Sequence, residues 1–171
     1  MTWQYNVMAA SVVALLTVLQ LVSCNDIPPP KTFRDYVVRG EFLTHSGRFD
    51  EAIENYRKAL EIDPESAVVY FRLGQALRLQ GKLDQANENY GKALSRAPKL
   101  SSAYLEWARS LQSQGKLDEA IEKYQKLTEL APKSYLAYKF WGDTLKQQGK
   151  LNEAEKMFQK ASEVDPTIHR K

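Results

Sequence analysis

Hydrophobic positions recur with a period of 34 residues along most of the chain. Segments beginning SGRFDEAIENYRKAL, QGKLDQANENYGKAL, QGKLDEAIEKYQKL and QGKLNEAEKMFQKAS start at Ser46, Gln80, Gln114 and Gln148. No insertion or deletion interrupts the spacing, and each copy holds two stretches of helical periodicity separated by a glycine. The pattern predicts four helix-turn-helix units, at residues 33–66, 67–100, 101–134 and 135–168, followed by a short tail at 169–171.

Residues of three kinds recur in register within these units. Small residues are expected where the paired helices approach most closely: Gly40, Gly74, Ala108 and Gly142 on the first helix, with Ala52, Ala86, Ala120 and Ala154 on the second. Aromatic residues fill the wider gaps: Tyr36, Tyr70, Tyr104 and Tyr138, then Tyr56, Tyr90, Tyr124 and Phe158. Turn residues mark the helix ends: Gly47, Gly81, Gly115 and Gly149 after the first helix, and Pro64, Pro98, Pro132 and Pro166 after the second.

This combination of period and register resembles the tetratricopeptide repeat family over about four fifths of the chain. The resemblance implies an all-α, right-handed α-solenoid whose concave face is lined by the first helix of each repeat. Polar residues replace apolar ones at the two ends of the array, with Arg39 in the first repeat and Glu155 and Ser162 in the last. We therefore expect the terminal repeats to act as caps.

The resemblance also implies which residues face the concave groove. From the five groove positions of each repeat we select as candidate binding residues Arg34, Val37, Glu41, Val68, Phe71, Gln75, Arg78, Leu79, Leu105, Arg109, Leu136, Lys139, Asp143 and Lys146. Val37, Phe71 and Leu105 would form an apolar strip with basic flanks, which suits a peptide that has hydrophobic anchors and some acidic residues. The alternative is that Phe71 and Leu105 pack locally against neighbouring helices.

One activity of this family is not expected here. Chaperone-tail adaptors of this fold hold a C-terminal carboxylate with a clamp of Lys, Asn and Arg. The corresponding positions are Val37, Glu41, Arg72, Ser102 and Glu106, or, one repeat later, Phe71, Gln75, Glu106, Leu136 and Phe140. Neither set has the composition to grip a carboxylate.

The first 30 residues differ from the rest, with one acid and no base. Residues 7–22 form an apolar run of about 24 Å as a helix, short of the roughly 30 Å hydrocarbon core. The run ends in LVSC, which resembles a bacterial lipobox. That resemblance implies a signal peptide at residues 1–23, a lipid on Cys24 and a tether at residues 24–32, holding the repeats in the bacterial cell envelope, facing the periplasm or the exterior.

The n-region MTWQYN departs from that pattern because it carries no Lys or Arg. The alternative is an uncleaved membrane anchor. In that case Lys31, Arg34 and Arg39 would hold the repeats in the cytoplasm by the positive-inside rule.

Charge and composition exclude several classes of function. The 24 bases lie among 20 acids from Lys31 onward and form no block, so no nucleic-acid partner is expected. The chain has two histidines and lacks HExxH, CxxC and glycine-rich phosphate motifs, so we expect neither catalysis nor a metal or cofactor.

The sequence thus predicts a non-catalytic, membrane-tethered scaffold that binds a partner peptide or protein in its groove and assists assembly of an envelope complex. Two alternatives stay open. One is a cytoplasm- or stroma-facing assembly factor for a photosynthetic or respiratory complex, and the other is a self-assembling structural solenoid.

Overall fold

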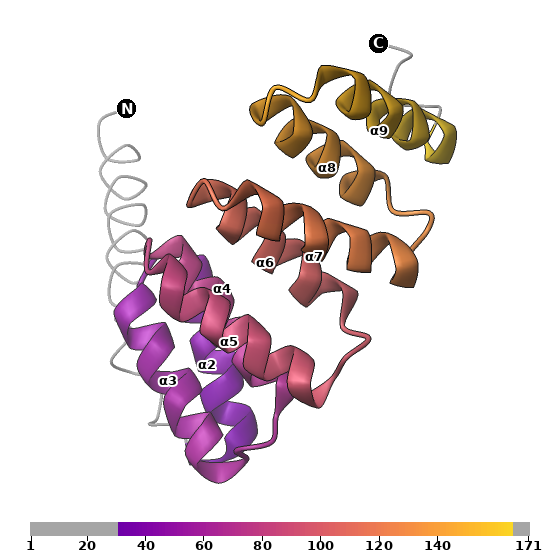
Figure 1. The fold of residues 1–171 in the computed structure, drawn as a ribbon. Helices are drawn as coiled ribbons and strands as arrows, with labels where there is room; N and C mark the ends of the chain where they lie inside the picture. Colours follow the sequence, from indigo (N-terminus) through magenta and orange to yellow (C-terminus); the bar gives the residue numbers. More distant parts are fainter. Residues whose placement is uncertain (1–30, 166–171) are drawn as a thin grey trace, which may run out of the picture. The chain divides into compact units, whose positions relative to one another are not determined.

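The repeats fold as consecutive antiparallel helix pairs in the computed structural model, which describes residues 31–165 (Figure 1). Their eight helices are α2 (Phe33–His45), α3 (Phe49–Ile62), α4 (Ala67–Leu79), α5 (Leu83–Arg96), α6 (Ser101–Ser113), α7 (Leu117–Leu130), α8 (Tyr135–Gln147) and α9 (Leu151–Val164). No strand occurs within the described residues. The predicted all-α repeat architecture is confirmed.

The helices stack in chain order, and each contacts the next. In addition, the first helices of neighbouring repeats contact one another, α2 with α4, α4 with α6 and α6 with α8. The second helices of neighbouring repeats make no such contacts within residues 31–165. The four first helices therefore form one continuous inner row, as expected of a solenoid.

Small residues opposite aromatic rings set the closest approach within each repeat. A Cβ atom at position 74 would lie 2.7 Å from Cε1 of Tyr90, and one at position 40 would lie 2.6 Å from Cε1 of Tyr56. Tyr56, Tyr90 and Tyr124 are almost completely buried. These contacts confirm the expected roles of the small and aromatic positions.

Glycine ends the turn between the paired helices because the backbone there is left-handed. Gly81 has φ of +85°, and its N–H donates to the carbonyl oxygen of Arg78 at 2.9 Å. The Lys82 N–H then donates to the carbonyl oxygen of Leu77, also at 2.9 Å. The glycines at the equivalent positions have φ between +73° and +79°. This αL ending agrees with the turn predicted from the sequence.

A polar ladder joins each repeat to the one before it. The side-chain amide at the end of one first helix donates to an aspartate in the first turn of the preceding second helix: Gln80 to Asp50 at 2.6 Å, Gln114 to Asp84 at 2.8 Å and Gln148 to Asp118 at 2.8 Å. Gln114, together with Lys116, lowers the pKa of Asp84 by stabilising its carboxylate. Ser46 and Asn152 occupy these positions in the first and last repeats, where the described stack offers no partner repeat.

The N-terminal end of the repeat stack is more apolar than Arg39 alone suggests. Val38 and Phe42 on α2 are both exposed. The residues equivalent to Phe42 in the other repeats are Ala76, Ser110 and Thr144, all of which are buried against the preceding repeat. The expected polar capping therefore describes this end only in part.

Several predictions lie outside the described residues, among them the signal peptide, Cys24, most of the tether and residues 166–171. Among residues 31–165, no helix combines the length and hydrophobicity needed to cross a bilayer.

Candidate functional site

The inner face is the surface that α2, α4, α6 and α8 present along their row. Most of the predicted groove residues remain at least partly accessible there. Arg34, Val68, Leu79, Leu136 and Lys146 are exposed, whereas Val37, Glu41, Gln75, Arg78, Leu105, Arg109, Lys139 and Asp143 are half-buried. The inner face thus offers a mixed surface of charged and apolar side chains.

Ion pairs connect adjacent first helices across this face. Between α2 and α4, Nε of Arg72 forms an ion pair with Oε1 of Glu41 at 3.1 Å. Nη1 of Arg72 also donates to Oε1 of Gln75 on its own helix at 3.2 Å. These bonds hold the Arg72 guanidinium against the inner face instead of letting it extend into solvent.

Glu106 makes the corresponding connection between α4 and α6. Its Oε2 forms an ion pair with Nε of Arg78 at 3.0 Å, and its Oε1 accepts a hydrogen bond from Nη1 of Arg109 at 3.3 Å. The Glu106 side chain is only 13% exposed. One carboxylate therefore lies between two guanidinium groups and leaves one positive charge in excess at this point.

Aromatic contacts continue the row to the fourth repeat. The Arg109 guanidinium lies 5.1 Å from the ring centroid of Phe140 on α8, and Nζ of Lys139 lies 5.0 Å from the same centroid. Lys139 also pairs with Asp143 at 2.9 Å. Cations above an aromatic ring are favourable contacts, so Phe140 helps to fix both basic groups.

A cleft of about 270 Å³ opens between the first two repeats on the inner face. Its lining comprises Glu41, Thr44, His45, Tyr56, Arg72, Gln75, Arg78 and Leu79. The Tyr56 hydroxyl lies 3.3 Å from Oγ1 of Thr44, and burial raises the pKa of Tyr56, so the phenol stays protonated at neutral pH. The cleft therefore combines two guanidinium groups and the Glu41 carboxylate with neutral hydrogen-bonding groups and the exposed Leu79.

The prediction that Phe71 faces the groove requires correction. Its side chain is 8% exposed, and its ring centroid lies 6.1 Å from that of Tyr90 in the core. Val37 and Leu105 also pack against the core clusters while remaining half-buried. The apolar side chains that are exposed among the predicted groove residues are Val68, Leu79 and Leu136.

Three residues of the inner face were missed as groove residues. Arg72, Glu106 and Phe140 share one repeat position, which is not among the family positions used to predict the groove. One signal was available, because Glu41 and Glu106 each find a base of opposite charge about one repeat away along the chain. Pairing charges between neighbouring first helices would have located the first two.

The structure also places the clamp positions considered above. Arg72, the one base of the first set, is held by Glu41. Glu106, common to both sets, presents a carboxylate to Arg78 and Arg109.

Within residues 31–165, no three His, Cys, Asp or Glu side chains gather as a metal site would require.

Comparison with solved structures finds related folds. One is a crystal structure of MamA, 27% identical, with a TM-score of 0.76 and coverage of 81% of each chain. Another is MamA 41-end from Desulfovibrio magneticus RS-1, 20% identical, with a TM-score of 0.74 and coverage of 80% of this chain and 77% of that one. A third is the first repeat domain of Spaghetti (RPAP3) bound to an HSP90 peptide, 22% identical, with a TM-score of 0.66 and coverage of 69% and 94%.

Comparison with curated proteins finds no significant match. Three family models, each described as a tetratricopeptide repeat, match residues 36–99, 71–135 and 111–169. Together they span nearly all of the helices described above. The chain therefore belongs to the tetratricopeptide repeat family, whose fold serves as a scaffold for protein–protein interactions.

Proposed function

We propose that the inner face binds an extended segment of a partner protein that carries both apolar and acidic side chains. The observation that carries this proposal is the cleft between the first two repeats. There the guanidinium groups of Arg72 and Arg78 lie beside the exposed Leu79. An acidic side chain of the partner would pair with the arginines, while an apolar neighbour would cover Leu79.

The charge of the inner face supports an acidic partner. Its basic residues are Arg34, Arg72, Arg78, Arg109, Lys139 and Lys146, and its acids are Glu41, Glu106 and Asp143. The excess of bases leaves the face positive even with every ion pair formed. Such a field favours association with acidic segments and weakens as salt increases.

The solved structure of the RPAP3 repeat domain holds the peptide SRMEEVD, which combines Met and Val with three acids. That peptide belongs to the RPAP3 complex, and at 22% identity the likeness concerns the fold. It supports the general view that this fold can hold a peptide of mixed apolar and acidic character.

The test replaces one exposed leucine on the inner face. Leu79→Glu places an acid where the partner is expected to contribute acidic and apolar groups, so binding should weaken about tenfold or more, while the fold persists. Leu151→Glu on α9 is the matched control, because Leu151 is also an exposed leucine but lies outside the inner face. Crosslinked capture with the full-length chain, quantified by mass spectrometry, measures the loss.

Proteins retained by Leu151→Glu and lost by Leu79→Glu would identify the partner and its pathway. Equal capture by both variants and the wild type would contradict the proposal. In that event self-assembly becomes the leading alternative, and sedimentation of the chain would decide it.

We further infer that the repeats are tethered to a membrane through a lipid on Cys24 and assist assembly of a complex in the bacterial envelope. The support is the apolar run ending in LVSC, with the chain's one cysteine at its last position. The alternative keeps the apolar run as an uncleaved anchor and places the repeats in the cytoplasm or stroma, as an assembly factor for a photosynthetic or respiratory complex.

Metabolic labelling with a palmitate analogue separates these two inferences. The wild-type chain should incorporate the label and fractionate with membranes, whereas Cys24→Ser should lose the label because no other thiol is present. A serine variant that stays in the membrane fraction, beside an unlabelled wild type, would favour the uncleaved anchor.

A further inference from the structure

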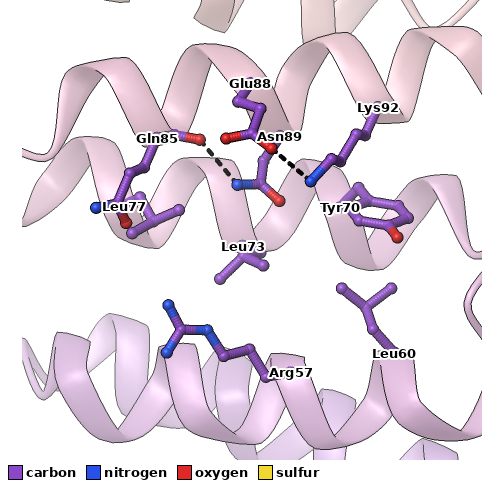
Figure 2. A pocket seen from close by; sticks show the side chains of 9 residues that line it. All are labelled: Arg57, Leu60, Tyr70, Leu73, Leu77, Gln85, Glu88, Asn89 and Lys92. Carbon is purple, nitrogen blue, oxygen red and sulfur yellow. Dashed lines mark hydrogen bonds and ion pairs between the residues drawn. The ribbon is translucent and has the colours of Figure 1, made fainter.

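A second hollow lies away from the inner face and is lined by residues of α3, α4 and α5. Its volume is about 480 Å³, within the range of ligand-binding pockets. Figure 2 shows the nine residues that line it: Arg57, Leu60, Tyr70, Leu73, Leu77, Gln85, Glu88, Asn89 and Lys92. None of them belongs to the cleft of the inner face.

The repeat explains why this hollow exists. In the next junction, Trp107 occupies the position equivalent to Leu73. A Cβ atom on Gly91 would lie 3.5 Å from Cη2 of Trp107, and Nζ of Lys123 lies 4.7 Å from the indole centroid. The indole thus fills the space between α5 and α7.

At the junction of the first two repeats the same three positions hold Arg57, Leu73 and Asn89. Leucine is much smaller than tryptophan, and the exposed Arg57 side chain lines the remaining space without filling it. The hollow is therefore the space from which a tryptophan is missing when this junction is compared with its neighbour.

The polar groups around the hollow include one acceptor for an indole N–H and one guanidinium for a carboxylate. Nδ2 of Asn89 donates to the carbonyl oxygen of Gln85 at 2.8 Å, and its amide oxygen points into the hollow (Figure 2). Glu88 and Lys92 pair with each other at 2.6 Å at the rim. Arg57 makes no ion pair or hydrogen bond within residues 31–165, so its guanidinium is available for a carboxylate.

We propose that this hollow receives a tryptophan side chain of a partner protein, next to an acidic residue that pairs with Arg57. The indole would lie between α3 and α5 against Leu60 and Leu73, as the chain's own Trp107 lies between α5 and α7 in the following junction. Its N–H would donate to the Asn89 amide oxygen. The site is separate from the inner face, so a partner can engage both surfaces at once and gain avidity.

The direct test titrates N-acetyl-tryptophanamide into the isotopically labelled full-length chain and follows its backbone amide resonances. Saturable shifts are expected around Leu60, Leu73 and Asn89 at millimolar concentrations. Leu73→Trp fills the hollow with the side chain used in the next junction, so those shifts should disappear. Trp107→Leu should open an equivalent space beside Gly91 and add a second set of shifts there.

Absent shifts in the wild type, or unchanged shifts in a folded Leu73→Trp variant, would overturn the proposal. N-acetyl-leucinamide controls for nonspecific apolar binding and should produce no saturable shifts at these residues.

The acidic neighbour is tested separately with the exposed Arg57, whose replacement should leave the fold intact even if Leu73→Trp does not fold. N-acetyl-tryptophan carries a carboxylate that the amide lacks, and should bind several-fold more tightly to the wild type. Arg57→Gln should abolish this difference while keeping the binding of the amide. Equal affinities for the two probes in the wild type would refute the pairing with Arg57.

Discussion

Replacing Gly74 with leucine is expected to lower the free energy of unfolding by about 3 kcal/mol or more. The reason is that a Cβ atom at position 74 would lie 2.7 Å from Cε1 of Tyr90 and 3.2 Å from the carbonyl oxygen of Ala86. Tyr90 is fully buried, so in a close-packed interior its ring can move only by displacing other side chains. The two helices of the second repeat must therefore separate, and the loss spreads to both neighbouring repeats.

A matched control uses another helical glycine. Gly91 lies in α5, where an added Cβ would meet only Trp107, at 3.5 Å. Gly91→Ala should raise the free energy of unfolding by about 0.5–1 kcal/mol, because alanine costs less backbone entropy in a helix. Urea denaturation followed by circular dichroism measures both variants. If the Gly74→Leu variant denatures at the same urea concentration as the wild type, the two helices do not approach each other as closely as the structure indicates.

The sequence predicted the helix pairs well because the same contacts are repeated four times. A glycine or alanine opposite an aromatic ring recurs at every copy, so one geometry explains four sets of residues. The turn glycines repeat in the same way, and their positive φ follows from the αL ending that they share. Periodic features of this kind are local to one repeat.

Features between repeats were harder to predict. Phe71 was assigned to the groove from its repeat position, yet it packs on Tyr90, while Lys139 at the same position of the last repeat lies over Phe140. Repeat position fixes the direction of a side chain only roughly. Whether that side chain is buried depends on the size of its neighbours in the adjacent repeat, and those neighbours vary from copy to copy.

The same variation produced the hollow beside Leu73. The sequence showed that Leu73 stands where Trp107 and Trp141 stand in later repeats. It did not show that the space would stay open, because that depends on Arg57 remaining exposed instead of folding over Leu73. The sequence shows leucine at position 73 where later repeats have tryptophan. Whether a hollow results depends on how the side chains of α3, α4 and α5 pack, which the sequence does not show.

Replacing Glu106 with glutamine is expected to change stability and binding in opposite directions. Loss of one partner from a fully buried ion pair costs about 3–5 kcal/mol. Arg78 and Arg109 are 24% and 39% exposed, so water screens part of this effect. We therefore expect the free energy of unfolding to fall by about 1–2 kcal/mol.

Binding should change the other way if the inner face recruits an acidic segment. Glu106→Gln releases Arg78 and Arg109 from the carboxylate that now neutralises one of them, so the variant should capture more of the same partner at equal protein concentration, most clearly at low salt. Glu54→Gln is the matched control, because Glu54 pairs with Lys58 at 2.7 Å on α3, away from the inner face. That control should change neither quantity appreciably.

The pair of measurements separates two roles for Glu106. If it only joins α4 to α6, its loss should lower stability and capture together, because a loosened stack presents its inner face poorly. If it also occupies arginines that an acidic partner would otherwise use, capture should increase while stability falls. Reduced capture by a variant whose stability is unchanged would instead indicate that the partner contacts Glu106 directly, and the preference of the inner face for acidic segments would then be wrong.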